Sequence, residues 1–98
     1  MRKRKIIWTN AAVEALDEFC EYIHRESPSA ARRVKKEIVL TAKKLATHPE
    51  MYQLDEFFAE HKNIRRFFRW SYRIVYQVLE TEVVILGVFH SSSPSDGD

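Results

Sequence analysis

Apolar residues recur at spacings of three and four over two stretches of the chain, and each stretch predicts one helical face. The first stripe is Val13, Leu16, Phe19, Cys20 and Ile23. The second stripe is Ala31, Val34, Ile38, Thr41 or Ala42, and Leu45. Ser27-Pro28-Ser29 lies between them, where proline stops the first helix and either serine caps the second. So short a connection predicts an antiparallel helical hairpin.

Short signals also place the outer ends of this hairpin. Lys3 to Trp8 is a candidate first strand, and Thr9 or Asn10 follows it as a cap for the first helix. His48-Pro49 is predicted to end the second helix, because proline interrupts helical hydrogen bonding. The place of the first strand in a sheet stays open.

The last third of the chain predicts three strands. They run roughly over Ile64 to Trp70, Tyr72 to Leu79, and Val83 to His90. The turns at Trp70-Ser71 and Glu80-Thr81-Glu82 are short enough to force antiparallel neighbours. The predicted fold class is therefore α+β, with an N-terminal strand and a helical hairpin packed on a mainly antiparallel sheet of three or four strands.

Alternation along the middle strand assigns two faces to this sheet. Tyr72, Ile74, Tyr76 and Val78 are expected to pack on the helices. Arg73, Val75, Gln77 and Leu79 are expected on the other, open face, where basic residues of the preceding strand could join Arg73.

Length and composition limit the remaining possibilities. The chain of 98 residues predicts one domain over residues 1–90, followed by a flexible, serine-rich and acidic tail over 91–98. No run of eighteen apolar residues could span a membrane, and the basic N-terminus precedes only a short apolar stretch, so we expect a cytoplasmic protein. Cys20 is alone, and no phosphate-binding loop or metal-ligand spacing appears, so neither cofactor nor metal is expected.

Positive charge is concentrated locally although the net charge is only +2. The stretch between His61 and Leu79 has no acidic residue and contains Lys62, Arg65, Arg66, Arg69 and Arg73. Such a face suits an anionic partner, either nucleic acid or an acidic protein segment. The alternative is structural: guanidinium groups stack on Phe67, Phe68 or Trp70, or pair with helix carboxylates such as Glu14, Asp17 or Glu18.

The second helix has a charged face of its own. Opposite its apolar stripe lie Arg32, Arg33, Lys35, Lys36, Lys43 and Lys44. This face is either simply solvated or a surface for a partner.

The amino-acid sequence of the last two predicted strands resembles the C-terminal half of the RelE/ParE toxin superfamily. The resemblance rests on Tyr72-Arg73-Ile74-Val75-Tyr76-Gln77-Val78 and Val84-Ile85-Leu86-Gly87-Val88-Phe89-His90. Ser27-Pro28-Ser29-Ala30-Ala31, His48-Pro49 and Asn63-Ile64-Arg65-Arg66 also resemble the ParE branch. The likeness extends from about Ile6 to His90 and implies a small bacterial toxin that is neutralised by an antitoxin.

The two branches of the superfamily imply different chemistry. RelE-like members cleave messenger RNA on the ribosome, with paired lysines, an in-strand arginine, and an arginine and a tyrosine after the last strand. Arg73 matches the in-strand arginine, and Arg65 or Arg66 could replace one lysine. The residues after His90 are Ser91-Ser92-Ser93-Pro94-Ser95, which contain neither arginine nor tyrosine. Since arginine stays protonated, it is also a poor general base.

The resemblance therefore favours a ParE-like toxin that inhibits DNA gyrase by binding rather than by catalysis. The alternatives are a ribosome-dependent mRNA endonuclease with Arg65, Arg66, Arg73 and His90 as candidate catalytic residues, or a degenerate member that acts only in an antitoxin–operator complex. His90 is either such a catalyst or a structural strand-end residue. The candidate target-binding residues are Arg65, Arg66, Arg69 and Arg73. Phe57 and Phe58 are the candidate antitoxin-binding residues, and operator DNA is expected to be bound only through the antitoxin complex.

Overall fold

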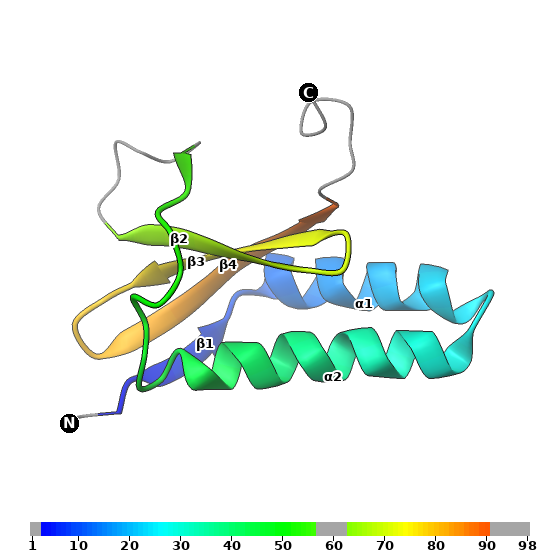
Figure 1. The fold of residues 1–98 in the computed structure, drawn as a ribbon, viewed down its shortest axis with the longest axis horizontal. Helices are drawn as coiled ribbons and strands as arrows, with labels where there is room; N and C mark the ends of the chain where they lie inside the picture. Colours follow the sequence, from blue (N-terminus) through cyan, green and yellow to red (C-terminus); the bar gives the residue numbers. More distant parts are fainter. Residues whose placement is uncertain (1–2, 57–62, 91–98) are drawn as a thin grey trace.

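The computed structural model describes residues 3–56 and 63–90. Its elements are β1 (Lys5–Trp8), α1 (Asn10–His24), α2 (Pro28–Lys44), β2 (Ile64–Arg69), β3 (Tyr72–Val78) and β4 (Glu82–His90). The two helices lie side by side on one face of the sheet (Figure 1). The predicted fold class is therefore confirmed. The expected tail over 91–98 and the residues Phe57 and Phe58 lie outside the described residues.

The sheet has four strands in the order β1-β4-β3-β2. The three C-terminal strands form the expected antiparallel meander. The first strand pairs in parallel with β4, from Lys5 opposite Glu82 to Trp8 opposite Ile85. The sheet is therefore mixed, and β1 forms its edge on the side away from β2.

Both helices begin at the capping residues that the sequence offers. Thr9 Oγ1 accepts a hydrogen bond from the Ala12 amide at 3.1 Å, and Ser27 accepts from Ala30 at 3.2 Å. Pro28 takes the first helical position of α2, where no amide hydrogen is needed. The predicted end of α2 at His48-Pro49 is wrong, because the helix ends at Lys44 and the chain turns before reaching the proline.

Thr9 also connects α1 to the sheet. Its hydroxyl lies 3.0 Å from the carbonyl oxygen of Ile85 and 3.2 Å from that of Leu86. At this place the β3–β4 register shifts, since Val75 pairs with Gly87 and Tyr76 with Ile85. The extra residue of such a bulge interrupts the ladder, and the Thr9 hydroxyl supplies a donor there.

The core lies between the helices and one face of the sheet. Tyr72, Ile74, Tyr76 and Val78 are buried in it, as the alternation along β3 predicts. The opposite face is only partly open: Val75 is 1% exposed and Asp55 0%, whereas Phe68 and Phe89 remain 47% and 44% exposed.

We expect Thr9→Ala to lower the free energy of unfolding by about 1–2 kcal/mol, because the variant loses a helix cap together with the bond to the bulge. Ser27→Ala is the matched control. It removes a cap alone and is expected to cost about 1 kcal/mol or less. Urea denaturation of both variants measures the difference. An equal loss in the two would contradict the role assigned to the bulge contact.

Candidate functional site

The arginines of the strand block are divided between the two faces of the sheet. Arg65 and Arg69 pair with Tyr76 and Tyr72, whose side chains point toward the helices. Side chains directly opposite each other on paired strands share a face. Arg66 lies opposite Val75, and Arg73 lies opposite Phe68, so both point to the other face.

On the helix side, the two β2 arginines bind Tyr52. Arg65 Nη1 donates to the Tyr52 carbonyl oxygen at 2.7 Å, and Arg69 Nη2 donates to the Tyr52 hydroxyl at 3.1 Å. The Arg69 guanidinium also lies 5.6 Å from the centre of the Phe67 ring. Both arginines therefore hold Tyr52, in the connection between α2 and β2, against the sheet.

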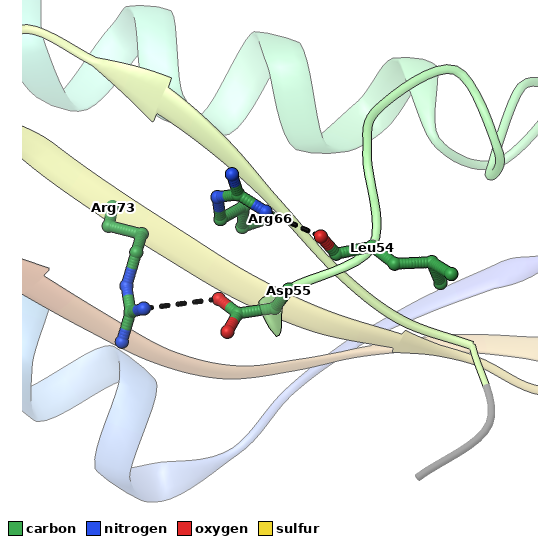
Figure 2. Close-up of polar contacts among 4 residues, drawn as sticks. All are labelled: Leu54, Asp55, Arg66 and Arg73. Atoms are coloured by element: carbon green, nitrogen blue, oxygen red, sulfur yellow. Dashed lines mark hydrogen bonds and ion pairs between the residues drawn. The ribbon is translucent and has the colours of Figure 1, made fainter. Parts of the chain in front are cut away.

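On the other face, Arg66 and Arg73 contact the same preceding segment (Figure 2). Arg66 Nη1 donates to the Leu54 carbonyl oxygen, and its guanidinium lies 5.5 Å from the Phe68 ring centre. Arg73 Nη1 lies 3.2 Å from Asp55 Oδ2. The stacking of an arginine on a neighbouring aromatic ring, one of the alternatives expected from the sequence, is therefore present for Arg66 and Phe68. The carboxylate that contacts Arg73 belongs to the loop and not to a helix.

Backbone bonds hold this segment, residues 49–55, along the outer edge of β2. We call it the edge segment. The Asp55 amide donates to the Ile64 carbonyl at 2.8 Å, and the Arg66 amide donates to the Gln53 carbonyl at 3.1 Å. At its start, the Tyr76 hydroxyl donates to the Pro49 carbonyl at 2.9 Å. Burial raises the pKa of Tyr76, so this hydroxyl keeps its proton for the bond.

The Asp55–Arg73 pair is shielded from solvent. The Asp55 side chain is 0% exposed and the Arg73 side chain 13% exposed. A buried carboxylate is tolerated only when a cation or hydrogen-bond donors meet it, so Asp55 fixes the place of Arg73 as much as the reverse. Sequence reasoning missed Asp55. No strong signal marked it, because Glu50 and Glu56 in the same irregular stretch are acidic as well.

Gly87 shapes the same face. A Cβ atom at this position would come within 2.9 Å of the Phe89 ring. The absence of a side chain therefore lets that ring lie against the strand, where the Arg73 guanidinium is 5.2 Å from its centre. Phe89 remains 44% exposed, and Phe68 on the same face remains 47% exposed. The result is a surface on which arginine and exposed aromatic side chains alternate.

His90 lies on the opposite side from Arg73. It pairs with Tyr72, and their rings meet edge to face with centres 5.3 Å apart. The Phe19 ring of α1 is 6.3 Å away. The structure therefore groups Arg66 with Arg73, and places Arg65, Arg69 and His90 on the helix side.

An open groove of about 350 Å³ runs where the edge segment meets β2. It is lined by Met51, Tyr52, Gln53, Arg66, Phe67, Phe68 and Arg69. Within residues 3–56 and 63–90, no group of three His, Cys, Asp or Glu side chains is arranged to hold a metal ion. Neither α1 nor α2, the helices of that described part, is long and apolar enough to cross a membrane.

Comparisons with known proteins agree with this fold. Residues 6–94 match the family described as the ParE toxin of the type II toxin–antitoxin system parDE. The fold is similar to a chain of the chromosomal ParDE system from P. aeruginosa, with a TM-score of 0.71 and 22% identity, covering 90% of this chain and 96% of that chain. It is also similar to a chain of the toxin–antitoxin complex RelBE2 from Mycobacterium tuberculosis, with a TM-score of 0.59 and 21% identity, covering 90% and 98%. No curated protein sequence matches the chain.

We expect Asp55→Ala to lower the free energy of unfolding by about 3–5 kcal/mol, because it leaves a largely buried guanidinium without its carboxylate. A double-mutant cycle with Arg73→Met measures the coupling by urea denaturation, and the double variant should lose much less than the sum of the single losses. The matched control is the exposed Asp17–Lys35 pair, at 3.8 Å, where a coupling of about 0–1 kcal/mol is expected. Additive losses at Asp55 and Arg73 would contradict the assignment.

Proposed function

Because the chain belongs to the ParE toxin family of type II toxin–antitoxin systems, we propose that it inhibits DNA gyrase by binding and is neutralised by a cognate antitoxin. Gyrase inhibition and binding of the antitoxin would both take place in the cytoplasm, the location expected from the sequence. The proposal concerns the target and the partner, since membership of the family is established by the match over residues 6–94.

The observation that favours binding over RNA cleavage is the division of the candidate catalytic residues between two faces. Cleavage at a 2′-hydroxyl needs a base, a cationic clamp and an acid that converge on one phosphate. Here Arg66 and Arg73 lie on one face, while Arg65 and His90 lie on the helix side. Arginine is protonated at neutral pH, so the first pair supplies positive charge but no general base.

The face that carries Arg66 and Arg73 has the composition of a protein-binding surface. Phe68 and Phe89 are exposed beside the two guanidinium groups, and Trp70 is exposed in the adjoining turn. Aromatic residues and arginine are enriched at the energetically dominant positions of protein interfaces. We assign this face to the gyrase contact.

A second surface, which shares Arg66 and Phe68 with the first, suits the antitoxin. The groove along the edge segment is lined by apolar and basic side chains, with Met51 52% exposed and Phe68 at its other side. An amphipathic segment could place its apolar residues in such a groove and its acidic residues on the arginines. Phe57 and Phe58, which follow the edge segment in sequence, remain candidates for the same contact. Sequence-specific recognition of operator DNA is assigned to the complex with the antitoxin.

We expect the purified chain to inhibit DNA supercoiling by gyrase. Arg66→Gln should raise the concentration for half-inhibition by about tenfold, because it removes a cation from the proposed contact face. Arg25→Gln is the control, since this exposed residue at the end of α1 changes the charge equally. Unaffected supercoiling together with mRNA cleavage on the ribosome would contradict the proposal and support the hypothesis of a ribosome-dependent mRNA endonuclease. If expression without the antitoxin is harmless and neither assay responds, the chain is a degenerate member.

Addition of the antitoxin should slow amide hydrogen exchange in residues 51–54 and 66–69, which line the groove. Met51→Glu should weaken antitoxin binding by about tenfold or more, since it places a charge in an apolar contact. Tyr22→Glu is the matched control, because Tyr22 is an exposed apolar residue on α1. Calorimetry measures both affinities. Protection confined to α1 and α2 would move the antitoxin site to the helical hairpin.

A further inference from the structure

The outer face of α2 carries a stripe of basic side chains that the proposed contacts do not use. Its members, all exposed, are Arg32, Arg33, Lys36, Lys43 and Lys44. We call this set the basic stripe. Leu40 is an exposed apolar residue within it, and Glu37 lies at its margin.

Helical geometry aligns these charges. At about 100° per residue, Arg32, Lys36 and Lys43 fall within roughly 40° of one another, and Arg33 and Lys44 flank them on one side. The line from Arg32 to Lys43 is about 16 Å long, since each residue adds about 1.5 Å. Three of the five cations therefore form a nearly straight row, with Arg33 and Lys44 about 60–120° round the helix from it. The whole set lies on one helix at the outside of the molecule (Figure 1).

No ion pair in the described part of the chain neutralises the stripe, although Glu37 lies on the same helix. None of its five members makes a side-chain hydrogen bond or ion pair with residues 3–56 or 63–90, whereas the neighbouring Lys35 pairs with Asp17 at 3.8 Å. Helix stability does not account for the whole stripe. Lys43 and Lys44 suit the negative end of the helix dipole, but Arg32 and Arg33 lie near the positive end, and the first turn has no acidic residue.

The composition of the stripe indicates which partner it fits. Protein interfaces are depleted in lysine and enriched in aromatic residues, whereas this row offers three lysines, two arginines and one leucine. A linear array of cations matches the regularly spaced phosphates of a nucleic acid. The arginines of β2 and β3 differ, because their guanidinium groups already contact the edge segment.

We propose that the basic stripe of α2 binds the phosphate backbone of duplex DNA without regard to base sequence. This inference rests on the proposed function for its setting, since gyrase acts on duplex DNA and a toxin bound to gyrase would lie near it. The contact itself is a property of this chain alone. It adds sequence-independent affinity and leaves operator recognition to the antitoxin complex.

Fluorescence anisotropy with a labelled 25-base-pair duplex, titrated with the full chain at several salt concentrations, tests the proposal. Five phosphate contacts predict a slope of log K against log salt of about −4.5, or a loss of about 500-fold in affinity between 50 and 200 mM salt. The variant Arg32→Gln/Lys36→Gln/Lys43→Gln should have a slope of about −1.8 and lose about 12-fold over the same range. A second duplex of unrelated sequence should bind equally well.

The control variant Lys3→Gln/Lys5→Gln/Arg25→Gln lowers the net charge by the same amount at exposed positions outside α2. It should keep most of the slope, and circular dichroism should show both variants folded. Equal losses in the two variants would overturn the proposal, because net charge and not the stripe would then be responsible. No binding at 50 mM salt would also overturn it, as would stripe-dependent binding of polyglutamate without binding of DNA. Gyrase is absent from this assay, so its outcome is independent of the supercoiling result.

Discussion

A carboxylate removed from water must be met by a cation or by hydrogen-bond donors, and the charge of Asp55 imposes this constraint on one face of the sheet. Arg73 meets it at 3.2 Å. Since neither group gains from separating in a nonpolar surrounding, the pair ties the edge segment to β3. With that segment in place, Arg65, Arg66 and Arg69 find acceptors on it, and the backbone of β2 finds a partner along its outer edge. An exposed strand edge is thereby partly covered.

The positive charge of the chain consequently serves two different purposes. The strand arginines act within the molecule, where they bind carbonyl oxygens, a carboxylate and aromatic rings. The five cations of the basic stripe on α2 are exposed and make no side-chain hydrogen bond or ion pair with residues 3–56 or 63–90. The basic cluster that stands out in the sequence is thus partly engaged within the molecule, and only its side beside the exposed Phe68 and Phe89 is assigned to a partner. The family to which the chain belongs, the ParE toxins, is established by the match over residues 6–94.

The sequence predicts those parts of the fold that depend on neighbouring residues. The two apolar stripes, the caps at Thr9 and Ser27 and the turn at Trp70-Ser71 are local signals, and each predicts its element correctly. The parallel pairing of β1 with β4 is not local, because it joins strands at opposite ends of the chain. The role of Asp55 was not predicted for the same reason: its contact with Arg73 is not local in sequence, and it lies in an irregular segment. The division of the β2 arginines between the two faces could have been predicted from the sequence. A two-residue turn places Arg69 opposite Tyr72, and this register determines the face of every other β2 side chain.

The burial of Asp55 and Arg73 also has a consequence for how this sequence can change over time. A substitution at either position alone removes one member of a buried ion pair and weakens the setting of the other, so a change at one position disfavours survival of the pair's remaining charge. Lineages that lose the pair are expected to replace both residues, because exchanging a whole buried ion pair for apolar residues of similar volume is often neutral for stability. Positions 55 and 73, one in a loop and one in a strand, should therefore covary among relatives.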